Sequence, residues 1–161
     1  MRVRAVLGSL LFLLVAPGVV AGLIPWWLTG WTAAGDVPPV LVIAGAALVV
    51  AGSAVLLHAF ARFALEGLGT PAPVAPTVHL VVGGLYRHVR NPMYLAVGAT
   101  ILGQALILDR PGLLVYLLAF ALAVAAFVHG YEEPALARSF GAEYDAYRRA
   151  VPAWLPRLRG R

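Results

Sequence analysis

The chain has 161 residues, of which 61% are hydrophobic and only 12% charged, with a net charge of +5. Soluble domains carry about 25% charged residues, and a globule of this size has too little interior to bury so much apolar surface. The composition therefore argues against a soluble enzyme, a disordered chain and a disulfide scaffold, and it indicates a membrane protein.

Four windows without charged residues mark the expected membrane segments, because an ionised side chain at the bilayer centre costs about 2.5–3.5 kcal/mol. A helix needs about 20 residues to cross the hydrocarbon core. We therefore expect one all-α membrane domain with four spans, at residues 5–28, 39–60, 92–108 and 111–128. Because the third span is short, we expect it to tilt little or to lean on neighbouring helices.

The first segment has a competing interpretation as a signal peptide. Residues 1–4 are basic, an apolar run follows, and residues 19–21 resemble a cleavage site. Against this interpretation, the apolar run continues to Leu28, and Trp26 and Trp27 lie where an aromatic belt ends a membrane helix. The sequence favours a retained span but leaves cleavage open.

The arginines predict the orientation in the membrane. All twelve basic residues are Arg, and with four spans every one except Arg110 falls on the side of the two termini. Cytoplasmic loops carry such an excess of positive charge. We therefore expect a multi-pass protein of the cell (inner) membrane, with both termini, the loop at 61–91 and the tail at 129–161 in the cytoplasm.

The two cytoplasmic segments differ in character. Residues 67–76 are rich in Pro, which fixes the backbone in an extended connection. The tail is amphipathic, because apolar and aromatic residues recur at steps of three or four, the period of a helix. This stripe consists of Leu136, Phe140, Tyr144, Tyr147 and Val151, and Gly141 is a candidate break within it.

A first candidate site lies at the start of the third span. Asn91-Pro92 is typical of a helix start, with Asn as the N-cap and Pro at the first helical position. The free N–H groups there would attract an anion, and Arg90 adds a full charge beside them. The competing interpretation is an ordinary cytoplasmic helix start, which commonly shows a cap and a flanking Arg.

A second candidate site is the pair Glu132-Glu133, directly after the fourth span. Successive helical side chains point about 100° apart, so we expect only one of the two to face inward. An inward carboxylate would suit a ligand with an ammonium group or hydroxyls. Alternatively, the two acids merely begin the tail helix, with Pro134 in its first turn.

Other site types find little support. The chain has no Cys, which removes thiol nucleophiles and thiolate metal sites. The spacing of its histidines matches no zinc pattern, so we expect no metal; they are His58, His79, His88 and His129. No pattern indicates a nucleic-acid partner, and none indicates an obligate protein partner.

Four blocks in one order, at residues 80–86, 90–94, 132–133 and 140–144, the last followed by Tyr147 and Val151-Pro152, resemble the isoprenylcysteine carboxyl methyltransferase and phospholipid methyltransferase families. The resemblance covers about residues 67–156. It implies an integral membrane methyltransferase that uses S-adenosylmethionine at the cytoplasmic face and methylates a lipid-soluble acceptor. By this resemblance, the cofactor site would consist of Val78, His79, Leu80, Val81, Tyr86, Arg90, Asn91, Pro92, Met93, Tyr94 and Glu132.

Within that implied site, Arg90 and the helix start at Asn91 suit the cofactor carboxylate, and Glu132 suits its amino group or ribose hydroxyls. Tyr86 and Tyr94 suit the adenine or the sulfonium. No catalytic base is identified.

Two positions depart from the isoprenylcysteine enzymes: Asn91 stands where His is usual, and Val128 stands where an Arg holds the substrate carboxylate. We therefore expect the acceptor to be either an isoprenylcysteine-like carboxylate or a lipid amine such as that of a phospholipid, a thiol or another apolar acceptor.

A rival interpretation is a non-catalytic membrane protein or transporter subunit. A conduction path usually needs polar residues within the spans. Here the nearest candidates are Gln104 and Ser53, and small polar residues more often join helices to one another. The sequence therefore favours the methyltransferase.

Overall fold

The computed structural model describes residues 11–66 and 79–156, without the side chains of residues 63–66. Within this part of the chain every regular element is helical, which confirms the predicted all-α class. The elements in chain order are η1 (Val19–Leu23), α2 (Ile24–Thr29), α3 (Pro39–Glu66), η2 (Gly84–Arg87), α4 (Pro92–Leu108), α5 (Pro111–Phe127), η3 (Val128–Glu132), α6 (Glu133–Phe140) and α7 (Ala142–Ala150).

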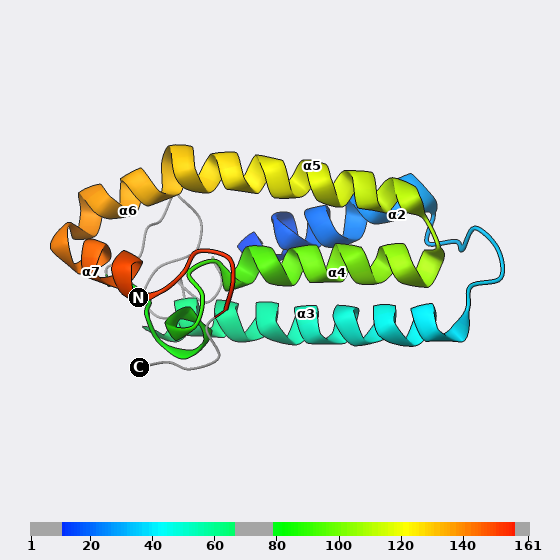
Figure 1. Cartoon of the computed structure of the whole chain (residues 1–161), viewed down its shortest axis with the longest axis horizontal. Coiled ribbons are helices and arrows are strands. Elements are labelled where there is room, and N and C mark those ends of the chain that lie inside the picture. The colour runs from blue at the N-terminus through cyan, green and yellow to red at the C-terminus, as the bar shows by residue number, and fades with distance from the viewer. Residues whose placement is uncertain (1–10, 67–78, 157–161) are drawn as a thin grey trace.

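The long helices run along one axis with α4 in the middle, between α3 and α5 (Figure 1). The first helix, Leu11–Thr29, contains η1 and α2 and contacts α4 through η1. Seven of the 17 residues of α4 are buried, whereas Leu113 is the single buried residue of α5. The short helix α4 is therefore enclosed by its longer neighbours.

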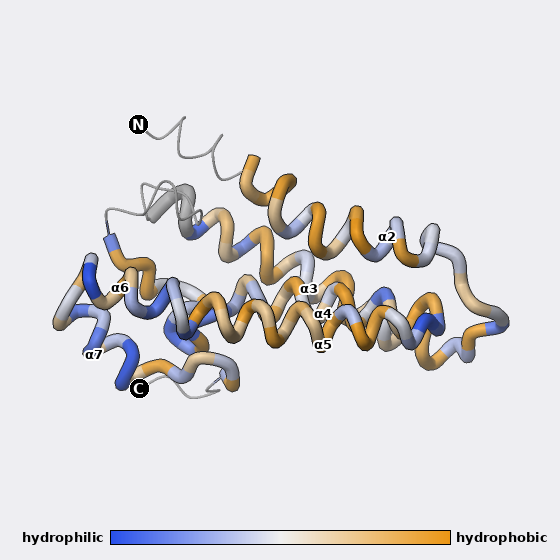
Figure 2. The backbone as a smooth tube through the Cα atoms, turned by 90° about the horizontal axis from the view of Figure 1, so that it is seen from above, coloured by the Kyte–Doolittle hydropathy of each residue, from blue (hydrophilic) through white to orange (hydrophobic). Residues whose placement is uncertain are grey.

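Among the described residues, three helices are long and apolar enough to cross a membrane, namely Leu11–Thr29, Pro39–Arg62 and Pro111–Phe140. Helix α4 is apolar but shorter, so the four-span topology stays a prediction. Figure 2 shows hydrophobic residues along the long helices and hydrophilic residues concentrated at the end formed by α6 and α7. Which membrane side this end faces, and hence the cytoplasmic placement of the termini, also stays a prediction.

Two helices extend beyond the membrane spans predicted within them. The helix that begins at Pro39 continues to Glu66, beyond the predicted residue 60. The helix that begins at Pro111 does not end at Val128 but runs to Phe140, so the tail stripe begins inside it. Residues 5–10 of the first predicted span and the Pro-rich segment 67–76 lie outside the described residues.

Each π-helical segment ends two residues before a proline: η1 precedes Pro25 and η3 precedes Pro134. Proline has no N–H and its ring clashes with the carbonyl four residues earlier, so a regular α-helix cannot pass through it unchanged. In the first helix the carbonyl four residues before Pro25 is that of Ala21. Its oxygen accepts a 2.7 Å hydrogen bond from the Gln104 side chain of α4, so Gln104 joins two helices, as its polarity within an apolar span predicts.

The tight packing of α3 on α4 requires glycine at their crossing. A Cβ added at Gly45 would lie 2.5 Å from the carbonyl oxygen of Gly103, and one at Gly103 would lie 2.6 Å from that of Gly45. Such close approach of two backbones is typical of membrane helix pairs with small residues at the contact.

We expect Gly45→Ala to lower thermal stability in detergent, by about 1–3 kcal/mol, because the methyl group forces the helices apart. In a helix without this contact the same change stabilises by about 0.5–1 kcal/mol. Gly112→Ala is the matched control, since no atom lies within 4 Å of a Cβ there. Equal unfolding temperatures for the two variants would contradict this account of the helix contact.

Candidate active site

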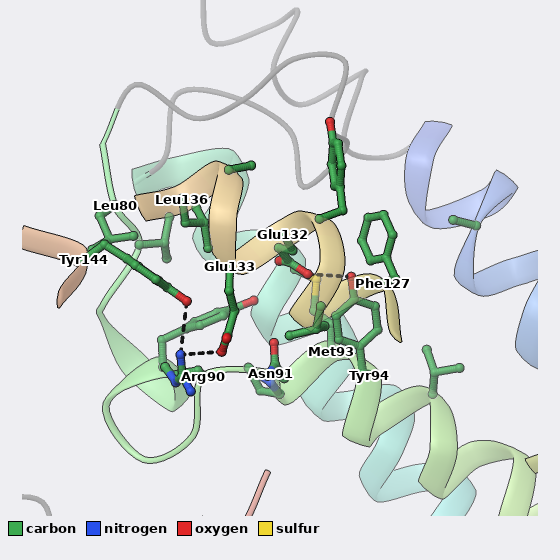
Figure 3. A pocket seen from close by; sticks show the side chains of 18 of the residues that line it. Leu80, Arg90, Asn91, Met93, Tyr94, Phe127, Glu132, Glu133, Leu136 and Tyr144 are labelled. Carbon is green, nitrogen blue, oxygen red and sulfur yellow. Dashed lines mark hydrogen bonds and ion pairs between the residues drawn. The ribbon is translucent and has the colours of Figure 1, made fainter. Parts of the chain in front are cut away.

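A cavity of about 430 Å³ lies where α4 begins and where α6 and α7 follow α5, a volume within the usual range for small-ligand sites. One part of its wall is polar and consists of Arg90, Asn91, Tyr94, Glu132, Glu133 and Tyr144. The part along the first helix and α5 is apolar and includes Phe12, Ala16, Pro17, Val20, Phe120 and Phe127. In Figure 3, Tyr144 and Arg90 lie on one side of the cavity and Phe127 lies toward the first helix.

The start of α4 contributes to the polar wall, but not as the capping rule predicts. Asn91 is the N-cap residue and Pro92 the first helical residue, yet the Asn91 side chain makes no cap hydrogen bond. Its Nδ2 instead donates to the carbonyl oxygen of Ala153 at 3.1 Å. The predicted helix start, with Asn91 as the N-cap and Pro92 at the first helical position, is therefore confirmed, and the Asn91 amide joins this start to the C-terminal segment.

Arg90 and Glu133 form a buried ion pair with 2.8 Å between Nη1 and Oε1, and their side chains are only 11% and 8% exposed. The same Nη1 donates to the Tyr144 hydroxyl at 3.0 Å. The other oxygen of Glu133 lies 3.3 Å from His129 Nδ1 and 3.8 Å from Arg148. The charge of Arg90 is thus balanced, but its Nε is buried and has no hydrogen-bond partner among the described residues.

Glu132 lies beside this ion pair and has a different partner. Its Oε2 accepts a 3.0 Å hydrogen bond from the Tyr94 hydroxyl (Figure 3). Both acids line the cavity, so the prediction that only one of them faces inward is wrong. The physical reason is that each carboxylate has its own partner on the cavity wall: Glu132 accepts from Tyr94, and Glu133 pairs with Arg90.

Three tyrosines complete the polar wall. The Tyr147 hydroxyl donates to the carbonyl oxygen of Tyr86 at 2.8 Å, and Tyr144 contacts Arg90 as described. Burial raises the pKa of Tyr86, of Tyr144 and of Tyr147 above the ordinary value of a phenol. All three hydroxyls therefore stay protonated at neutral pH, and none of them acts as a base.

The structure brings most of the predicted cofactor residues to this one cavity. Those that line it are Leu80, Val81, Tyr86, Arg90, Asn91, Pro92, Met93, Tyr94 and Glu132. His79 is exposed and is not among the lining residues, and Val78 lies outside the described residues. The assignment of these residues to a cofactor stays a prediction.

Some residues that line the cavity were not among the predicted site residues. Tyr144 and Tyr147 belong to the tail stripe, whose helical period was the signal that could have placed them at the cavity. No sequence pattern could have placed Phe12 and Ala16 of the first helix at the cavity. In an apolar run, residues that face lipid and residues that face a cavity are of the same types. Among the described residues, no group of three or more His, Asp or Glu could hold a metal ion.

Residues 40–143 match the family model of phospholipid methyltransferases, a match that covers well over half of the chain. The chain belongs to the phospholipid methyltransferase family. No curated protein and no solved structure matches it. Membership makes this protein a membrane methyltransferase, as the ordered sequence blocks predict.

The family match contains α4 and both acids of the cavity, but not the whole cavity wall. The first helix precedes the matched region, and Tyr144 and Tyr147 follow it. The cavity of this phospholipid methyltransferase family member therefore combines a matched centre with two flanking segments, which supply apolar and polar lining respectively.

Proposed function

We propose that the protein transfers a methyl group from S-adenosylmethionine to a lipid-soluble acceptor. The observation that carries this proposal is the convergence of the α4 start and the acid pair on one cavity. These segments are about 40 residues apart in the chain, yet Tyr94 contacts Glu132 and Arg90 contacts Glu133.

The polar groups of the cavity fit the charges of S-adenosylmethionine, which has a carboxylate, an ammonium group and a sulfonium. The buried Nε of Arg90 has no partner among the described residues, and such groups usually have one, so it suits the carboxylate. Glu132 suits the ammonium group or the ribose hydroxyls. The ring of Tyr94 beside Glu132 suits a cationic centre.

The bound cofactor supplies an electrophilic methyl group, and the residues of this chain supply position and shielding. Glu132 and Arg90 would hold the donor in one orientation, which removes much of the entropic barrier to an in-line attack. The apolar lining would exclude water from the reacting atoms. Because Glu133 is paired with Arg90 and the buried phenols stay protonated, catalysis would rest on positioning and not on a dedicated base.

The charges of the cavity favour a lipid amine over a carboxylate as the acceptor. Arg90 is already paired with Glu133, and Val128, where a substrate-binding Arg would stand, is an apolar cavity residue only 1% exposed. Glu132, which would hold the ammonium group or the ribose hydroxyls of the cofactor, is an acid, so none of the described lining residues other than Arg90 is a cation that could hold an acceptor carboxylate. An isoprenylcysteine-like acid is thus the second candidate.

The apolar part of the cavity would receive the hydrocarbon portion of the acceptor. We expect Ala16→Leu to reduce methylation of long-chain acceptors severalfold, because the larger side chain fills this space while leaving the polar wall intact. Ala119→Leu is the matched control, since Ala119 is exposed on α5 and does not line the cavity. Equal rates in both variants, measured with acceptors of several chain lengths, would contradict this placement of the acceptor.

The direct test of the proposed function is incubation of membranes containing the protein with methyl-labelled S-adenosylmethionine, followed by lipid extraction and separation. We expect label in an amine-bearing phospholipid. Label in an acidic lipid would support the second acceptor class. No protein-dependent label in any lipid, together with solute flux in reconstituted vesicles, would favour the non-catalytic alternative.

A further inference from the structure

The C-terminal segment 144–153 is attached to segment 86–91 at several points. The Tyr147 hydroxyl donates to Tyr86 O at 2.8 Å, and Arg90 Nη1 donates to the Tyr144 hydroxyl at 3.0 Å. Two further bonds join Arg90 N to Pro152 O at 2.9 Å and Asn91 Nδ2 to Ala153 O at 3.1 Å. One short stretch of the polar wall thus depends on the C-terminal segment for four hydrogen bonds.

This attachment requires the chain to turn back after α6. Gly141 lies between α6 and α7 with φ of +50° and ψ of −124°, a conformation that residues with a side chain rarely adopt. After this turn Tyr144 becomes one of the most buried residues of the described chain, at 2% exposure. The family match ends at residue 143, so the attached segment follows the matched region.

We propose that residues 144–153 act as a strap that sets the affinity for the cofactor, with Tyr147 and Asn91 as positioning residues. This inference rests on the proposed function. The strap fixes the main chain at Tyr86 and Arg90, and it holds the guanidinium of Arg90 through Tyr144. Asn91 acts through the strap, because its Nδ2 donates to the carbonyl oxygen of Ala153.

The first test measures affinity for S-adenosylhomocysteine by calorimetry on the full-length protein in detergent. We expect Tyr147→Phe and Asn91→Ala each to weaken binding at least fivefold, and to raise the KM for S-adenosylmethionine with little change in kcat. Tyr116→Phe is the matched control, because its hydroxyl also donates to a main-chain oxygen at 2.8 Å, that of Val20, between α5 and the first helix. We expect Tyr116→Phe to lower thermal stability by about as much as Tyr147→Phe does, and to leave the affinity for S-adenosylhomocysteine unchanged.

The second test needs no cofactor: hydrogen exchange of main-chain amides in the same variants. We expect Tyr147→Phe and Asn91→Ala to raise exchange in segments 86–91 and 144–153 together, and Tyr116→Phe to raise it in neither. Exchange that rises only in 144–153, or an affinity loss equal to that of Tyr116→Phe, would overturn the strap. Wild-type protein that shows the expected exchange but binds no S-adenosylhomocysteine would instead overturn the proposed function, and with it the effect of the strap on affinity.

Discussion

Glu132→Gln is expected to weaken cofactor binding by about 10- to 100-fold while the protein stays folded. The substitution keeps an oxygen that accepts the Tyr94 hydrogen bond but removes the negative charge. A hydrogen bond to a charged group contributes about 1.5–3 kcal/mol, which corresponds to that range of affinity. Titration calorimetry with S-adenosylhomocysteine measures the effect, and thermal unfolding verifies the fold.

Glu143→Gln is the matched control for this prediction. It removes the same charge from the same end of the molecule, but Glu143 is an exposed residue of α7 and does not line the cavity. We expect wild-type affinity in this variant. If Glu132→Gln and Glu143→Gln bind equally well, Glu132 is no part of the cofactor site.

The second large effect concerns stability. Arg90→Met is expected to destabilise the protein by about 3–5 kcal/mol, because it leaves the carboxylate of Glu133 buried without its main partner. Arg148→Met is the control: this arginine is 55% exposed and lies 3.8 Å from the same carboxylate, so we expect a loss of about 0–1 kcal/mol. Thermal and denaturant unfolding in detergent measure both changes.

The double variant Arg90→Met with Glu133→Leu separates stability from function. Because apolar residues can replace a buried ion pair at little cost, we expect most of the lost stability to return. Cofactor affinity should stay low, since Arg90 is still missing. Recovery of both stability and affinity in the double variant would show that Arg90 serves the fold alone.

The all-helical class follows from the sequence because charge is excluded from membrane spans, and the predicted starts at Pro39, Pro92 and Pro111 agree with the observed helices. The helices extend beyond the predicted spans: the fourth span is predicted to stop at Val128, whereas its helix continues to Phe140 through the π segment η3. The distribution of charged residues indicates which part of a helix can lie in lipid. It does not indicate where the main-chain hydrogen bonds of the helix end.

The candidate site was only partly predictable. The family resemblance could place the motif around Asn91 near the acid pair. It could not predict which side chains of the two segments contact each other. The side chain of Asn91 bonds to Ala153, some 60 residues later, and no local rule contains a partner so distant. The orientation of both acids depends on their partners Tyr94 and Arg90, and the apolar wall depends on how the first helix packs; both are tertiary features.

The measurement that tests the central claim most directly is a calorimetric titration of the purified wild-type protein in detergent with S-adenosylhomocysteine. The convergence of the α4 start and the acid pair on one cavity predicts saturable binding at one site per chain, weakened by Glu132→Gln and unchanged by Glu143→Gln. An absence of saturable binding up to millimolar ligand, by a protein that unfolds cooperatively, would contradict the account.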